Sequence, residues 1–185
     1  MLLVDDHPAV REGVRHLLAA QPDLVTIAES DSASADTVER ARWAEVAVID
    51  YQLPGHDGLW LTYQIKQRPG APRVLIYSAF ADRMLGIAAV VADADGLLDK
   101  GALDEELCVC IRMLARGRRQ LPVVPPWLAA AVASSLEPRD REVLSLLLHG
   151  IPPGEIASRL GTTQSELSAR RLMLLRKLTA RGHSN

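Results

Sequence analysis

Short apolar runs alternate with stretches of helical periodicity through the first 116 residues, and this alternation limits the possible folds. The predicted strands cover residues 1–4, 24–28, 46–50, 73–78 and 95–100. The predicted helices between and after them cover residues 8–20, 32–42, 59–66, 82–92 and 102–116. Strict strand–helix alternation favours a parallel sheet with helices on both faces. We therefore predict an α/β fold with a five-stranded, flavodoxin-like parallel sheet.

Polar side chains stand at the carboxyl ends of four of these strands: Asp5 and Asp6, Asp50, Ser78 and Lys100. In open α/β sheets such ends meet at one crevice, where ligands bind. Three facing carboxylates favour a hard cation, and Mg²⁺ bridges carboxylates to phosphate oxygens. Asp50 ends the most apolar strand and is placed to attack a phosphoryl group. Lys100 and Ser78 could contact the oxygens of that group.

Four motifs occur in order at these positions, namely LLVDDHPAVREG, VIDYQLPGHDG, VLIYSAF and DGLLDKGALDEEL. Over about residues 1–119 they resemble the receiver domain of two-component response regulators. The resemblance implies that Asp50 accepts a phosphoryl group from a sensor histidine kinase. The implied site residues are Asp5, Asp6, Asp50 and the backbone carbonyl of Gln52 for Mg²⁺, with Ser78 and Lys100 as switch contacts. One departure is Leu97, which stands where such receivers usually have Tyr or Phe.

Charge divides the 185-residue chain into two parts. Residues 1–119 hold 18 acidic and 13 basic side chains, whereas residues 120–185 hold 5 acidic and 8 basic ones. An acidic front and a basic back suggest two modules, the second facing a polyanion. Neither an export signal nor a membrane span is expected. Cys108 and Cys110 are expected to be buried thiols of a cytoplasmic protein.

The basic part opens with a proline-rich linker, residues 120–136, in which 127–136 could form a short helix. Three helices are predicted at 137–150, 152–161 and 162–178, and a helix, a glycine-containing turn and a second helix suggest a helix-turn-helix. PRDREVLSLLLHG, EIASRLG and RKL resemble the LuxR-type helix-turn-helix of the NarL/FixJ subfamily. We expect a receiver at 1–119 and a small all-α domain at 137–185, and we expect that domain to lack the family's fourth helix.

By this resemblance the helix from Gln164 would enter the major groove of double-stranded DNA. The expected DNA-binding residues are Gln164, Ser165, Ser168, Arg170, Arg171, Arg176 and Lys177. Two features depart from the family pattern. Glu166 would bring negative charge towards phosphates. Helical spacing places Arg171 on the core face, from which its guanidinium could extend to water.

These features predict a two-domain response regulator that is phosphorylated at Asp50 and regulates transcription, and that is not an enzyme. A homodimer through the receiver or the linker is expected, because we expect no fourth helix of the kind that usually helps pairing. One alternative is a receiver whose altered helix-turn-helix binds another protein rather than DNA. A second is a phosphatase with Asp50 as nucleophile, which would need a general acid near Asp50. No nearby residue stands out for that role.

Overall fold

The sheet has five parallel strands in the order β2-β1-β3-β4-β5, as predicted. The strands are β1 (Leu2–Val4), β2 (Ala28–Ser30), β3 (Val46–Asp50), β4 (Arg73–Ser78) and β5 (Gly96–Asp99). This computed structural model describes residues 1–182, with side chains described for residues 1–180. The sequence VAVID of β3 is buried at all five positions, because helices cover both faces of the sheet.

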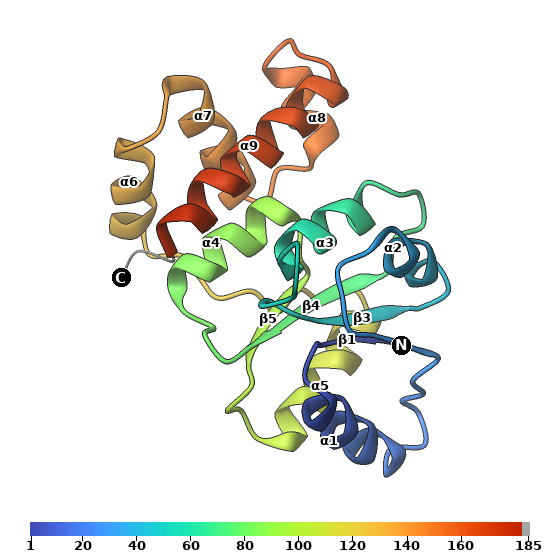
Figure 1. Ribbon diagram of the computed structural model, residues 1–185. Coiled ribbons are helices and arrows are strands. Elements are labelled where there is room, and N and C mark those ends of the chain that lie inside the picture. Colours follow the sequence, from blue (N-terminus) through green and yellow to red (C-terminus); the bar gives the residue numbers. More distant parts are fainter. Residues whose placement is uncertain (183–185) are drawn as a thin grey trace.

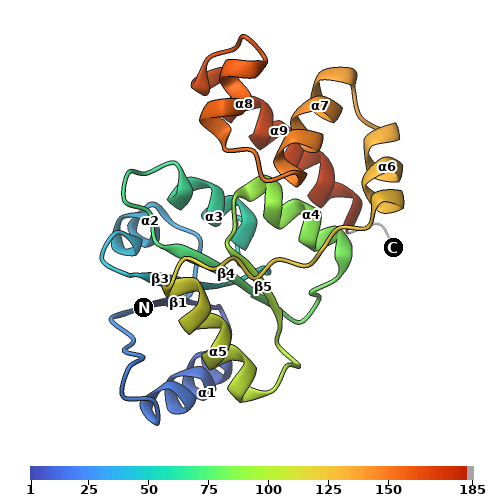
Figure 2. The ribbon, with the colours of Figure 1, turned by 180° about the vertical axis from the view of Figure 1, so that it is seen from behind.

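Two layers of helices enclose the sheet (Figures 1 and 2). One face is covered by α1 (Pro8–Ala19) and α5 (Asp104–Ala115), and the other by α2 (Ala35–Ala41), α3 (Gly58–Lys66) and α4 (Arg83–Ala92). The α/β fold predicted from the alternation is therefore confirmed. The thiols of Cys108 and Cys110 are free and buried.

The second predicted strand is displaced along the chain. Residues 24–27 lie outside β2, which begins at Ala28. The neighbouring strand β1 begins only at Leu2, so residues 24–27 have few backbone groups of β1 to pair with. Ile27 donates its N–H to the carbonyl of Met1. The side chains of Val25 and Ile27 are consequently exposed instead of joining the sheet core.

Three helices begin next to the carboxyl ends of the strands with a side-chain cap. Ser34, Asp57 and Asp82 each accept a backbone N–H from the first turn of α2, α3 and α4, respectively. At the start of α3 the chain passes very close to β3. A Cβ atom on Gly58 would lie 1.9 Å from the carbonyl oxygen of Asp50. Only glycine allows this approach, which holds the loop before α3 against Asp50.

The remaining helices are α6 (Pro126–Ser134), α7 (Pro138–Leu148), α8 (Pro153–Arg159) and α9 (Gln164–Gly182). They stack on the α3–α4 side of the sheet, and α9 packs along α4 (Figures 1 and 2). One continuous hydrophobic cluster joins the β1, β3 and β4 side chains to those of α7, α8 and α9. The linker runs beside β5, where Gln120 pairs with Gly96.

One further expectation concerns the C-terminal end of the chain. The third helix of the basic part was predicted to end at residue 178, but α9 continues to Gly182. The sequence analysis also expected no fourth helix after this one. Residues 183–185, on which that expectation partly falls, lie outside the described residues. Within the described part of the chain, no helix is long and apolar enough to cross a membrane.

Candidate functional site

The polar residues predicted to meet at the carboxyl ends of the strands do lie together. Asp5 follows β1 and Asp50 ends β3, and their side chains are only 2% and 4% exposed. Lys100 follows β5 and reaches between them. Its Nζ lies 2.7 Å from Asp5 Oδ2 and 3.0 Å from Asp50 Oδ2. The ammonium group therefore forms an ion pair with each of two buried carboxylates and offsets one of their two negative charges.

The electrostatics of this cluster follow from burial and from the central lysine. Burial raises the pKa of the Asp50 carboxyl, although the hydrogen bond from Lys100 opposes this effect. Burial acts to lower the pKa of Lys100, but its hydrogen bonds to Asp5 and Asp50 outweigh that effect and raise it. Lys100 is thus held as a cation beside a carboxylate that is costly to ionise alone.

The acidic group has the donor set that a hard cation needs. Ligand atoms of Asp5, Asp6, His7 and Asp50 all lie within 4.8 Å of one another. Asp6 Oδ1 is shielded from solvent and makes no hydrogen bond of good geometry, although His7 Nδ1 lies 2.8 Å away. A buried carboxylate oxygen without a hydrogen bond is costly unless a cation approaches it. The residues present therefore fit a divalent cation with oxygen ligands.

Ser78 and Gln52 border the same cluster. Ser78 ends β4 and is 1% exposed, and its Oγ accepts the backbone N–H of Phe80 at 3.1 Å. The Lys100 N–H donates to the Ser78 carbonyl at 2.9 Å, which ties the ends of β4 and β5 together. The backbone of Gln52 hydrogen-bonds to the Asp50 carboxylate. A group bound to Asp50 would therefore meet Ser78, Lys100 and the loop after β3.

The helix predicted to read DNA, α9, is docked on the α/β part of the chain. Tyr63 of α3 donates its hydroxyl to the carbonyl of Ser168 at 2.6 Å. Ser168 Oγ donates to Gln67 Oε1 at 3.0 Å. Arg171, one turn later, donates through Nε and Nη2 to the carbonyl of Val91 in the last turn of α4, at 3.2 and 2.8 Å. These contacts occupy one side of α9.

The position of Arg171 shows that one expectation was wrong. Its guanidinium was expected to extend to water, yet the residue is 2% exposed. The charge is buried against the C-terminal end of α4, where backbone carbonyls carry partial negative charge. The guanidinium carbon also lies 5.5 Å from the centre of the Tyr63 ring. Burial lowers the pKa of Arg171, although the charge of Asp93 opposes this effect, and no carboxylate of the described side chains forms an ion pair with the guanidinium. The residue is therefore inaccessible to DNA in this conformation.

Two further DNA-binding candidates are paired inside the helical part. Asp140 of α7 is 3% exposed. It accepts Arg170 Nη1 at 2.9 Å and Lys177 Nζ at 2.7 Å. Burial acts to raise the pKa of Asp140, but hydrogen bonds from Lys177 and Arg170 outweigh it and lower that pKa. These two cations hold α9 to α7, so neither is wholly available for phosphates.

The other candidates, Gln164, Ser165 and Arg176, are exposed on α9. Glu166 lies beside them and serves the helix start. Its carboxylate accepts the backbone N–H of Thr163 at 2.9 Å, while the Thr163 hydroxyl accepts the N–H of Glu166 at 3.2 Å. This reciprocal pair is a capping box. The hydrogen bonds that the carboxylate accepts from the backbone N–H of Thr163 and from the hydroxyls of Thr162 and Thr163 lower the pKa of Glu166 to about 2. The departure from the family pattern thus has a structural reason.

Tyr63, Gln67 and Asp140 contribute to these contacts, and the sequence analysis did not select them. Tyr63 lies in α3 and Gln67 directly follows that helix, and the helical pattern of α3 gives no sign that this end of it meets α9, more than 100 residues away. The sequence around Asp140 gave little indication that this residue would be buried. An acid at the third position of a helix ordinarily faces water and interacts with the helix dipole, so its burial could not be expected.

Comparison with known proteins agrees with this geometry. The response regulator receiver domain family matches residues 1–112. The transcriptional regulatory protein UhpA of Salmonella typhimurium strain LT2 is 33% identical over 95% of this chain and 89% of its own length. The nitrate/nitrite response regulator NarL of Escherichia coli K12 is 28% identical over 96% and 88%. A LuxR-family regulator structure from Aurantimonas has 33% identity and a TM-score of 0.61, covering 72% of this chain and 94% of its own.

Proposed function

The chain belongs to the response regulators of two-component systems, and on that basis we propose that it is a phosphorylation-controlled, DNA-binding transcriptional regulator. One observation carries the proposal: three carboxylates and Lys100 converge at the end of β3, a strand that is buried along its whole length. The proposal assigns residues 1–119 to a receiver, 120–136 to a linker and 137–185 to a helix-turn-helix domain. It also assigns a cytoplasmic location, which the two buried free thiols favour.

The phosphoryl group would come from a phosphohistidine of a sensor kinase. A carboxylate oxygen of Asp50 attacks phosphorus, and the new O–P bond forms as the N–P bond of the histidine breaks. Mg²⁺ held by Asp5, Asp6, Asp50 and the Gln52 carbonyl would supply positive charge against the incoming oxygens. Lys100 leaves Asp5 and pairs with one phosphoryl oxygen, and the Ser78 hydroxyl donates to another. The protein acts as a regulator and not as an enzyme in this scheme.

The position of α9 supports control of DNA binding by the receiver. Ser168 and Arg171 contact α3 and α4, so α9 cannot lie in a major groove while these contacts persist. Movement of Ser78 towards a phosphoryl group would pull on the β4–α4 loop through the hydrogen bond from Phe80. A shift of α4 would then weaken the contacts of Arg171. Phosphorylation would thus favour a state in which α9 is free.

A phosphotransfer experiment tests the first half of this proposal. Incubation with a small phosphodonor and Mg²⁺ should add one phosphoryl group, measured as an increase in intact mass. Asp50→Asn should abolish the gain, whereas Asp57→Asn, which alters a nearby cap outside the acidic cluster, should retain it. Undiminished labelling of Asp50→Asn would refute the assignment of Asp50.

A second candidate function is protein binding through the helical part. The pairing of Arg170 and Lys177 with Asp140 favours it, because these two candidate phosphate contacts are already neutralised. DNA binding driven by phosphate contacts shows a steep salt dependence. The absence of any DNA binding by the phosphorylated full-length chain would promote this second candidate.

A further inference from the structure

One side of α9 is apolar along its middle, although this helix is the one that would face DNA. Ser165 begins this side and Arg176 ends it, and both are exposed. Between them, at helical spacing, stand Ala169, Leu172 and Met173. Ala169 is exposed, Met173 is 58% exposed and Leu172 is half-buried. These three side chains form the apolar patch of α9.

The charged side chains beside this patch are already engaged elsewhere. The carboxylate of Glu166 is held at the helix start by its capping box. Arg170 is paired with Asp140, and Arg171 is buried against the end of α4. Bases are usually distinguished by arginine or lysine on guanine and by asparagine or glutamine on adenine. The middle of α9 therefore offers few hydrogen-bonding groups to the edges of bases.

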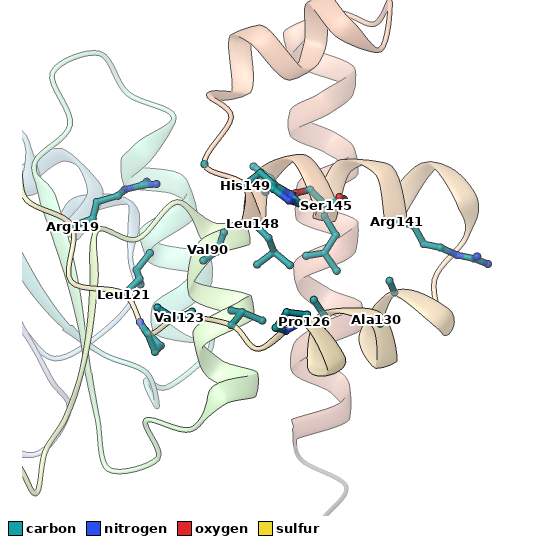
Figure 3. Close-up of a pocket in the computed structure, with 17 residues that line it drawn as sticks. Val90, Arg119, Leu121, Val123, Pro126, Ala130, Arg141, Ser145, Leu148 and His149 are labelled. Carbon is teal, nitrogen blue, oxygen red and sulfur yellow. The ribbon is translucent and has the colours of Figure 1, made fainter.

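The interface that holds α9 on the α/β part leaves room for its release. A cavity of about 630 Å³ lies between Val90 of α4, the linker, and Ser145 and Leu148 of α7 (Figure 3). Side chains around a cavity lack part of their packing contacts, so separation of α7 from α4 costs less here than across a filled interface. Leu172 follows Ser168 by one helical turn, and Ser168 contacts the end of α3. Release would therefore expose Leu172 beside the rest of the apolar patch.

We propose that Ala169, Leu172 and Met173 read the methyl groups of thymine, so that the DNA site of this chain is rich in thymine where α9 meets the major groove. Thymine is the one base that presents a methyl group there, and apolar side chains contact it. Arg176 at the end of the patch would contact a phosphate. The 8 basic and 5 acidic side chains of residues 120–185 favour DNA over a protein as the partner. The inference rests on the proposed function, because it names the bases that the same helix would recognise.

Replacement of thymine by uracil isolates the methyl group, since the two bases pair identically. Duplexes that bind the phosphorylated full-length chain are selected from a random-sequence pool, and the selected site is remade with uracil at one thymine at a time. The site should contain clustered thymines. Uracil should weaken binding about fourfold at each contacted position, as expected for one buried methyl group. Uracil outside the site should leave the affinity unchanged.

Two variants assign the effect to the apolar patch. Met173→Ser removes an apolar contact at an exposed position, so it should abolish the preference for thymine over uracil at one position without a change in melting temperature. Val109→Ser is the matched control, because Val109 is 56% exposed but lies in α5, on the opposite face of the sheet. It should retain the full preference. A Met173→Ser variant that still distinguishes the two bases at every position would contradict the assignment.

The same measurements separate this inference from the proposed function. Specific binding that uracil weakens at no position would overturn the inference and leave DNA binding intact. A guanine-rich site that depends on Arg176 would also overturn it. If the phosphorylated chain bound no duplex of the pool, the proposed function would fail together with this inference, and the apolar patch would be left to a protein partner.

Discussion

Lys100 offsets part of the negative charge of the acidic cluster, and it competes with a metal ion for the same oxygens. Its ammonium group lies within 3.0 Å of carboxylate oxygens of Asp5 and Asp50. A divalent cation would use oxygens of the same two side chains. Stability without metal and affinity for metal should therefore change in opposite directions when this lysine is removed.

Lys100→Met should lower the free energy of unfolding without metal by on the order of 1–3 kcal/mol, since two buried carboxylates lose their cation. Mg²⁺ should then raise the melting temperature of this variant more than that of the wild type. Lys66→Met is the matched control, because Lys66 lies 2.8 Å from the buried Asp95, outside the acidic cluster. The Lys66→Met variant should also lose stability, but Mg²⁺ should not restore its melting temperature. Thermal unfolding with and without Mg²⁺ measures both, and equal recovery would contradict this role of Lys100.

The two neighbouring carboxylates should contribute unequally to Mg²⁺ affinity. Asp5 is already engaged by Lys100 and by the backbone N–H of His7, whereas Asp6 Oδ1 makes no hydrogen bond of good geometry. Asp6→Ala should therefore weaken Mg²⁺ binding more than Asp5→Ala does. Metal titration followed by calorimetry or tryptophan fluorescence compares them. An equal loss of Mg²⁺ affinity in the two variants, or a larger loss for Asp5→Ala, would contradict this prediction.

At the scale of elements, α9 is held from two directions. Its Ser168 and Arg171 contact α3 and α4, while Arg170 and Lys177 pair with Asp140 of α7. The first set must separate before the helix can enter a major groove. The second set can persist, because it lies within the helical part itself. DNA binding should therefore respond to changes in the first set.

Tyr63→Phe removes one contact of the first set, the hydrogen bond to the Ser168 carbonyl. Loss of about 1 kcal/mol from the docked state should raise the undocked fraction about fivefold. DNA binding by the unphosphorylated chain should tighten by a similar factor. Tyr77→Phe is the matched control, because Tyr77 packs with α1 and α5 on the opposite face of the sheet. Gel-shift titration measures both variants, and equal affinities would argue against docking as the restraint.

The salt dependence of DNA binding should distinguish the exposed from the paired cations of α9. Arg176 is exposed, whereas Lys177 is paired with Asp140 at 2.7 Å. Arg176→Gln should reduce the slope of log K against log salt by about 1, as for one lost phosphate contact. Lys177→Gln should change that slope less. A larger change for Lys177→Gln would show that its ion pair breaks on DNA.

The sequence predicted the α/β fold and the acidic cluster because both depend on local pattern. Apolar runs ending in Asp50 or Ser78 indicate buried strands and the edge at which they end. The burial of Arg171 could not be predicted, because it depends on where α9 meets α4. The displaced start of β2 at Ala28 likewise depends on where β1 begins, which the apolar run at residues 24–28 does not reveal.

At the scale of the whole molecule, the α/β part and the terminal helices share one hydrophobic cluster. Two separately folded domains on a linker would each have a core of their own. The shared core makes the docked arrangement a defined state that a phosphoryl group could destabilise. It also explains how the acidic cluster, at the end of β3, could act on α9 through α4.

Binding of the full-length chain to genomic DNA fragments, with and without Mg²⁺ and a phosphoryl analogue, tests this account most directly. The account predicts weak, salt-sensitive binding without the analogue and at least tenfold tighter binding with it. Asp50→Asn should remain at the weak level under both conditions. Equal affinity with and without the analogue, or an Asp50→Asn variant that responds to the analogue as the wild type does, would contradict it.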